Sequence, residues 1–245
     1  MYDERRTSLV ARLGVAIGVV SLLALGAAGP LHHQGLLGLT AAFGVLKWAV
    51  CGAVATRVLA VIAIIVAARR RSGVSTAVTA MVLALIAIGS LGALVWKAAR
   101  APRIHDVTTD TEHPPQFVAV LPLRAGALNP VEYGGPEIAA QQHKGYADIA
   151  PLTLNVPPGR AFDRALAAAR TMGWELVASD PGAGRIEATD TTFWFGFKDD
   201  IVIRVAPAPN GSRVDVRSLS RVGGSDIGTN AARIRTYLKT LNAAP

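Results

Sequence analysis

Three long apolar runs occupy the first hundred residues of the chain, and shorter alternating patterns occupy the rest. A membrane-spanning helix needs about 20 consecutive apolar residues. The second and third runs meet this length, and the first meets it when Pro30 and Leu31 are included. No Asp or Glu occurs between Glu4 and Asp106. We therefore predict that residues 1–100 are a membrane region with three transmembrane helices, over about residues 13–31, 46–68 and 74–96.

The first run has a second interpretation, because basic residues precede it as they precede the apolar core of a signal peptide. These residues are Arg5, Arg6 and Arg12. However, two further runs follow, and the small residues around Leu25–Ala28 form a poor cleavage site. We favour an uncleaved first helix.

The distribution of positive charge orients the three helices. Loops on the cytoplasmic side of a membrane carry an excess of Lys and Arg. Six positive charges precede the first run or separate the second from the third, and the intervening loop, residues 30–45, has none. Four others dilute the signal: Lys47, Lys97, Arg100 and Arg103. We predict a multi-pass protein of the bacterial inner (plasma) membrane, with its N-terminus in the cytoplasm and its C-terminal domain in the periplasm.

Residues 151–245 have the pattern of an α+β domain with an antiparallel sheet of about five strands and two helices. The predicted order is β-α-β-β-β-β-α. The last helix is indicated by buried positions at helical spacing, beginning with Ile227. The segments in order are Pro151–Val156, Ala161–Met172, Trp174–Ala178, Arg185–Thr189 extended by Thr192–Phe197, Ile201–Val205, Arg213–Leu219 and the final helix.

Residues 101–150 are predicted to be a Pro-rich extended arm on this domain. Nine of the fourteen prolines lie between Pro102 and Pro158, and proline removes a backbone donor and restricts the residue before it. One short strand is expected near Phe117–Leu121.

Two patterns in the sheet predict which way side chains face. The aromatic residues of Thr192–Phe197 alternate in a predicted strand, so we assign them to the core. Arg213, Asp215 and Arg217 also alternate, and we expect them to form ion pairs across strands on a solvated face.

The net charge of +8 belongs entirely to the membrane half, which has ten Lys and Arg against two acids. The second half has fifteen of each. A nucleic-acid-binding surface requires basic residues on a folded face, so nucleic acid is excluded as a partner. The single cysteine, Cys51, excludes an intrachain disulfide.

Arg57 is an intramembrane charge near the middle of the second run. Such residues are costly in a bilayer and often functional. Because no carboxylate lies in this run, its counter-ion would be a lipid phosphate, a partner subunit or the soluble domain. The alternative is a helix register that brings Arg57 close to an interface.

Titratable residues crowd the segment from His105 to His113, where His105, Asp106, Asp110 and His113 are candidates for ligand binding. Two His and nearby carboxylates can hold a divalent metal. Their spacing matches no standard metal site, and Thr/Asp runs also form turn hydrogen bonds. We favour a structural clasp between arm and domain, and assign no metal and no cofactor.

A second candidate site precedes the last helix. Arg217 and Arg221, with the free amides of the turn at Ser225 and Asp226, could hold an anion or a lipid headgroup. Asp226 itself argues against a phosphate, and Ser225 or Asp226 is equally a good helix N-cap.

Several motifs resemble a bacterial membrane-protein family catalogued as domain of unknown function 1499. The resemblance covers about residues 104–241 and is carried by four segments: His105–Asp110 with Pro114-Pro115, Tyr146–Leu152, Trp194–Asp200 and Arg213–Asn230. It implies an anchored domain, with no activity or catalytic residues to carry over.

Together these features favour a non-enzymatic cell-envelope protein, whose partners are the lipid bilayer and an envelope protein or lipid ligand; an oligomer is compatible with the sequence. The alternative is an envelope enzyme that uses the His105–His113 segment for acid–base or metal chemistry. A third hypothesis is a transporter subunit centred on Arg57.

Overall fold

The computed structural model describes residues 9–70 and 73–243. The chain divides into two compact units. The first comprises residues 1–97 and the short segment Phe193–Gly196, and the second comprises the remainder. Three basic residues used in the orientation argument, Arg5, Arg6 and Arg71, lie outside the described residues.

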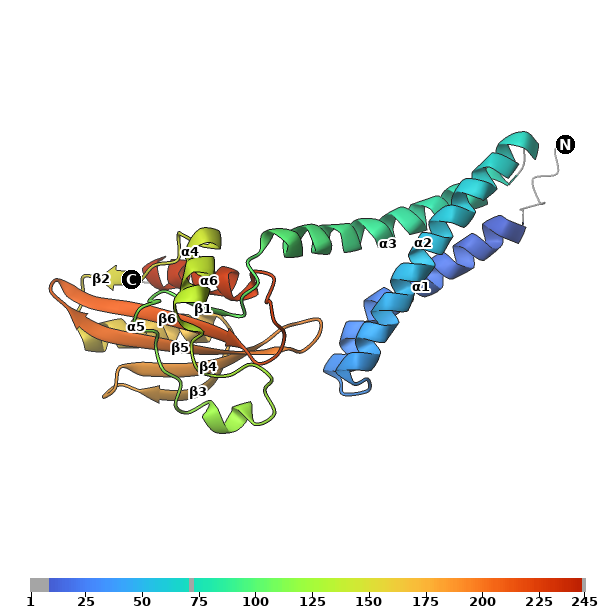
Figure 1. Ribbon diagram of the computed structural model, residues 1–245. Helices are drawn as coiled ribbons and strands as arrows, with labels where there is room; N and C mark the ends of the chain where they lie inside the picture. The colour runs from blue at the N-terminus through green and yellow to red at the C-terminus, as the bar shows by residue number, and fades with distance from the viewer. Residues whose placement is uncertain (1–8, 71–72, 244–245) are drawn as a thin grey trace. The chain divides into compact units, whose positions relative to one another are not determined.

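Three helices in the first unit are long and apolar enough to cross a membrane, which confirms the three predicted spans (Figure 1). They are α1 (Leu9–His33), α2 (Leu39–Arg70) and α3 (Val74–Arg100). Each exceeds the 20 or so residues that a bilayer requires. The chain therefore has a membrane-like helical region where its apolar runs predict one.

Small residues line the contact between α1 and α2. Gly14 and Gly18 on α1 are buried, and a Cβ at Gly18 would lie 3.0 Å from Thr56 Cγ2 on α2. The buried positions of α2 are almost all alanine. Glycine and alanine allow helix backbones to approach closely, which is the main source of helix association in lipid. Arg57, one position after Thr56, is exposed on α2.

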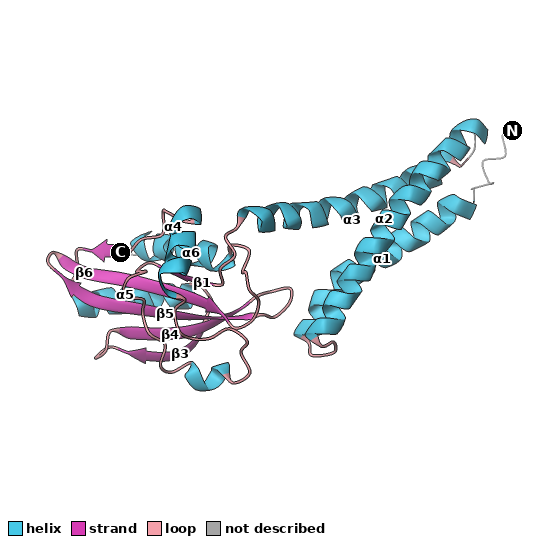
Figure 2. Ribbon diagram, viewed as in Figure 1, coloured by secondary structure: helices cyan, strands magenta, loops and turns pink. Residues whose placement is uncertain are grey.

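The second unit has a six-stranded antiparallel sheet with strand order β1-β6-β5-β4-β3, and β2 pairs with the same edge of β6 as β1 (Figure 2). From residue 151 the elements follow the predicted order β-α-β-β-β-β-α, so the α+β fold is confirmed. They are β2 (Leu152–Leu154), α5 (Pro158–Thr171), β3 (Glu175–Asp180), β4 (Arg185–Thr191), β5 (Lys198–Ala208), β6 (Gly211–Ser220) and α6 (Thr229–Ala243).

The two faces of the sheet are covered differently. Alternate residues of β5 and β6, such as Ile201, Ile203 and Val216, pack with α5 and α6 in the main hydrophobic core. The opposite face is covered by the arm, where Phe117 and Val120 pack on Val202 and Leu219 of the sheet. The expectation that Asp215 and Arg217 lie on a solvated face is therefore wrong, because both are fully buried beneath the arm.

The arm contains more regular structure than its prolines suggest. It includes β1 (Asp106–Thr108), the 3-10 helix η1 (Leu121–Arg124) and α4 (Gly135–Gly145). The predicted strand at Phe117–Leu121 is wrong, since no strand is formed there. In place of another strand, Gln142 of α4 bonds the outer edge of β1: Thr108 N donates to its Oε1 at 2.9 Å, and its Nε2 donates to Thr108 O at 2.7 Å.

The aromatic segment Thr192–Phe197 is also not a strand. It forms the loop between β4 and β5, because Thr191 already pairs with Lys198 across the two strands. Thr192 N donates to Phe197 O, Phe197 N donates to Thr192 Oγ1, and both distances are 2.8 Å. Gly196 adopts a positive φ of 69°, which completes the turn at little steric cost.

The last helix begins at Thr229, two residues after its predicted first buried position. Ile227 has a positive φ of 53° and lies outside the helix. The later positions Ala231, Ile234 and Leu241 are fully buried as predicted.

Candidate functional site

Buried ion pairs join the arm to the sheet face that it covers. The central pair is Arg217 on β6 with Asp106 on β1. Arg217 Nε lies 3.0 Å from Asp106 Oδ1 and Arg217 Nη2 lies 2.7 Å from Oδ2, so the contact is bidentate. The Arg217 side chain is 0% exposed and also donates to the carbonyls of Pro115 and Val131. Burial raises the pKa of Asp106, and the Arg217 guanidinium acts against that shift.

A second cluster lies further along the same strands, around Asp110. Its carboxylate accepts from Arg204 at 2.9 Å and Arg213 at 2.8 Å, and both arginines also bond Asp215. Desolvation by itself would raise the pKa of Asp110. The hydrogen bond from the backbone amide of His113 and the two arginine charges outweigh it, so the pKa of Asp110 is lowered.

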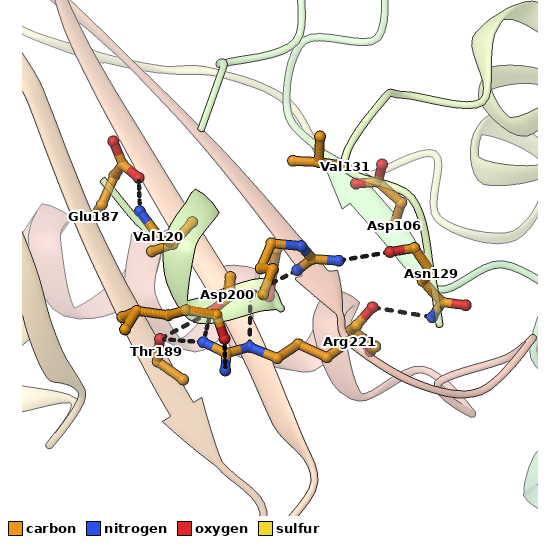
Figure 3. Close-up of polar contacts among 12 residues, drawn as sticks. Asp106, Val120, Asn129, Val131, Glu187, Thr189, Asp200 and Arg221 are labelled. Carbon is orange, nitrogen blue, oxygen red and sulfur yellow. Dashed lines mark hydrogen bonds and ion pairs between the residues drawn. The ribbon is translucent and has the colours of Figure 1, made fainter. Parts of the chain in front are cut away.

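A third cluster surrounds Asp200 on β5. Arg124 of η1 donates to Asp200 Oδ2 at 2.6 Å, and Arg221 donates to both Asp200 oxygens at 3.0 and 2.7 Å. Thr189 Oγ1 donates to Oδ1 at 2.8 Å. Figure 3 shows Arg221 lying beside Asp200 and Thr189. One buried carboxylate therefore receives two guanidinium groups, one from the arm and one from the end of β6.

Glu187 on β4 is fully buried and accepts the backbone amides of three successive arm residues. Figure 3 shows its contact with Val120. Its Oε1 receives Val118 N and Ala119 N, and its Oε2 receives Val118 N and Val120 N, all at 3.0 Å. Arg185 lies 3.0 Å from Oε1. Successive amides that converge on one anion form an anion-binding concavity, and here the anion is a side chain of the sheet.

Residues 118–129, which we call the apolar turn, are held from the other end by Arg221 and Asn129. The Arg221 carbonyl accepts from Leu128 N at 2.9 Å, and Arg221 Nη1 donates to Leu123 O at 2.7 Å. Asn129 Nδ2 donates to Ser220 O and Gly223 O, each at 2.9 Å.

Val120 and Arg124 of the apolar turn are buried against the sheet, but its other large side chains are exposed. Leu128 is 76% exposed, and three other large apolar residues of the turn are also exposed: Val118, Leu121 and Leu123. The turn therefore combines a fixed backbone with a solvent-facing apolar surface.

The predicted anion site before α6 is occupied by the chain itself. Asp226 Oδ1 accepts Gly228 N at 2.8 Å and Asp226 Oδ2 accepts Asn230 N at 2.6 Å, so its carboxylate caps the helix. Ser225 Oγ accepts Ile227 N at 3.3 Å. Arg221 and Arg217 are bound to Asp200 and Asp106, as described above. Ligand binding by these residues stays a prediction, and each of them has an internal partner.

The candidates of the His105–His113 segment do not converge. Asp106 and Asp110 bind different arginines, and His113 is exposed, with its carbonyl accepting from Arg204 at 2.9 Å. His105 is half-buried and its carbonyl accepts Ser220 N. In the described residues, no group of three or more His, Cys, Asp or Glu side chains has a geometry that could hold a metal ion. The segment has the contacts that a clasp between arm and domain requires.

Three residues of this network were missed in the sequence: Glu187, Arg124 and Asn129. A signal existed for Arg124, which is the one Lys, Arg, Asp or Glu between His113 and Val131. A lone charge in an apolar arm indicates a buried partner, because an unpaired buried charge is strongly unfavourable. The role of Glu187 depends on backbone amides distant in sequence, which no residue pattern reveals.

Two tyrosine hydroxyls in the domain have no hydrogen-bond partner in the described structure, those of Tyr133 and Tyr146. Burial raises the pKa of each to about 12, with the neighbouring carboxylates of Asp106 and Asp226 adding to the effect. Both hydroxyls are therefore neutral donors near neutral pH.

The motifs that carry these contacts can be compared with known families. The model of a protein family described as protein of unknown function (DUF1499) matches residues 106–241. This chain belongs to that family. The match begins at Asp106, the partner of Arg217, and ends in α6, so it contains all the ion pairs between arm and sheet described above. Searches of curated proteins and of solved structures gave no match.

Proposed function

We propose that this protein is a multi-pass protein of the bacterial inner membrane that presents its α+β domain to the periplasm, where the domain binds an envelope protein without catalysing a reaction. The observation that carries the proposal is the apolar turn, residues 118–129. Its backbone is fixed by buried charges, and all its large apolar side chains except that of Val120 are exposed.

A fixed backbone favours binding because little conformational entropy is lost when a partner docks. Glu187 holds three successive amides of the turn, and Arg124 and Arg221 bind Asp200 beneath it. The sheet therefore supports the turn as a rigid platform. A loop without a recognition role would be expected to carry polar residues at its surface.

The exposed residues indicate the chemistry of the partner. Leu121, Leu123 and Leu128 are aliphatic, and exposed apolar patches typically mark sites of protein interaction. Arg124, the one Lys, Arg, Asp or Glu in the turn, is buried against Asp200. The surface thus suits an apolar protein segment better than a charged ligand.

The engagement of the ionisable residues supports a non-enzymatic role. A general acid or base must reach its substrate with a free proton-accepting or proton-donating atom. Asp106, Asp200 and Glu187 instead bind arginines or backbone amides inside the domain.

The charge distribution of the membrane region supports the proposed compartment. Positive residues concentrate before the first apolar run and between the second and third runs, and such segments are retained in the cytoplasm. After three crossings the domain would lie on the opposite side, in the periplasm.

Site-specific photo-crosslinking in cells tests the binding role. A benzoylphenylalanine placed at Leu128 should give one discrete adduct that weakens at least fivefold when Leu121 and Leu123 are both replaced by Ser. The same probe at Thr153, exposed on the β2 edge, is the matched control and should give no such adduct. Equal adducts at both positions, or an adduct unaffected by the double substitution, would reject the apolar turn as the binding surface.

A further inference from the structure

The loop between β4 and β5 places aromatic side chains where loops usually have polar ones. Turn tips favour Gly, Asn, Asp and Ser, but here the tip reads Phe193-Trp194-Phe195-Gly196. Phe193 is 94% exposed, the highest value among the large apolar residues. Such exposure is unfavourable in water, because each aromatic side chain carries a large apolar area.

The loop has a defined conformation. The two hydrogen bonds between Thr192 and Phe197 close it at its base. Within it, Trp194 packs edge-on against Phe195 at 5.0 Å between ring centroids and an angle of 85°. The segment Phe193–Gly196 belongs to the first unit with the apolar helices. Phe195 is buried and stacks on Phe43 at 5.7 Å between ring centroids, and Trp194 Nε1 donates to Gly26 O at 3.2 Å. Two of the three rings therefore pack on the apolar helices, and Phe193 stays exposed.

The strand register puts this loop at the end of the sheet where the chain enters the domain. Asp106, at the start of β1, and Asp200, two residues after the start of β5, both pair with Leu219 of β6. Neighbouring strands are about 4.8 Å apart, so the entry point and the base of the loop are separated by roughly 10 Å. The turn between β5 and β6 lies at the other end, about 30 Å away, since β5 rises about 3.3 Å per residue.

A short covalent link joins α3 to the first strand of the domain. Helix α3 ends at Arg100, and Ile104 is already buried in the domain core. Four residue steps span about 14 Å at most, at no more than about 3.6 Å each. The chain therefore leaves only a few residues between the last apolar helix and the first buried residue of the domain.

From these observations we infer that the aromatic loop Phe193–Gly196 inserts into the interfacial region of the lipid bilayer and anchors the domain to the membrane surface. Trp and other aromatic side chains favour that region, where apolar rings leave water and polar atoms stay hydrated. Lys198, exposed at the base of the loop, is placed to reach lipid phosphates, as lysine side chains do at interfaces. This inference concerns a different surface from the apolar turn and does not depend on the proposed function.

Spin-label accessibility on the full-length protein in lipid nanodiscs tests the inference. Cys51 is the single cysteine, so a Cys51→Ala background allows one label at a time. Labels replace Phe193 at the tip, Lys198 at the base and, as the matched control, Asn210 in the exposed turn at the far end of β5. Power saturation then compares oxygen, which concentrates in lipid, with a water-soluble nickel chelate.

The expected order of lipid accessibility is Phe193 above Lys198 above Asn210, with oxygen dominant over nickel only at the first. A label at Phe193 as accessible to nickel as the label at Asn210 would overturn the inference. So would a Phe193 label protected from both reagents, because it would show that Phe193 also packs against protein, as Phe195 does, and does not enter lipid. Near-ultraviolet circular dichroism of each labelled variant verifies that the domain is folded.

Discussion

Replacement of Glu187 by Gln should detach the apolar turn from the sheet while leaving the core strands paired. Glutamine keeps the shape of glutamate but has one acceptor oxygen, and its amide nitrogen would face a backbone N–H of the turn. Glu187 is fully buried, so solvent cannot compensate for the lost contacts.

The expected cost can be estimated from the three backbone amides that bond Glu187. A hydrogen bond to a charged group contributes about 1.5–3 kcal/mol, a neutral one about 1 kcal/mol, and an unpaired buried group costs about 1–3 kcal/mol. Two bonds become neutral and Val120 N loses its acceptor. The sum is about 2–7 kcal/mol, a large part of the stability of a typical domain.

Hydrogen–deuterium exchange of the full-length protein in nanodiscs measures this effect locally. Peptides that contain residues 118–120 should exchange at least about tenfold faster in the variant, since each 1.4 kcal/mol corresponds to a factor of ten. Peptides of β6 should change far less. Glu175→Gln is the matched control, because Glu175 is exposed on β3, and it should exchange as the wild type does. Less than a fivefold change for Glu187→Gln would refute the reasoning.

Three further predictions concern other parts of the chain. Tyr146→Phe removes a hydroxyl without a hydrogen-bond partner and should leave the urea midpoint unchanged or raised. Tyr237→Phe removes a hydrogen bond to a buried carbonyl and should lower the free energy of unfolding by about 1 kcal/mol. Equal losses of stability in the two variants would contradict this difference. Asp110→Asn should lower the free energy of unfolding by roughly 1 kcal/mol at pH 7. The difference from wild type should close as pH falls below about 4, because a lowered folded-state pKa stabilises the fold only while the carboxylate is ionised. A difference that does not change between pH 7 and pH 3 would contradict this prediction. Gly18→Val should weaken α1–α2 packing by about 1–3 kcal/mol, measured by unfolding in detergent. Gly89→Val should be tolerated, because an added Cβ there meets nothing within 4 Å. Equal losses of stability in both variants would show that the α1–α2 contact is unimportant.

Periodic elements were predictable because one physical rule dominates each of them. The absence of acids between Glu4 and Asp106 and the length of the apolar runs were sufficient for three spans. Alternation in β5 and β6, together with helical spacing in α6, was sufficient for the element order.

The errors have a shared cause, which is that the alternation of a strand does not show what covers its polar face. Arg213, Asp215 and Arg217 have the same pattern whether water or an arm lies above them. The Pro-rich arm brings Asp106 and Asp110 onto that face and converts it into a buried network. The strand predicted at Thr192–Phe197 was wrong for a different reason. Its aromatic residues alternate as in a core strand, but Thr191 already pairs with Lys198, so the residues between them form a loop.

The central claim, that the domain is presented to the periplasm, is tested most directly by labelling with a membrane-impermeant maleimide in cells whose outer membrane alone is permeabilised. Single cysteines are placed in the Cys51→Ala background at Asn210, in the domain, and at Ser75, exposed near the start of α3. The account predicts that the cysteine at 210 is labelled at once and that the cysteine at 75 is labelled only after the inner membrane is lysed. Labelling in the reverse order would contradict the account and place the domain in the cytoplasm.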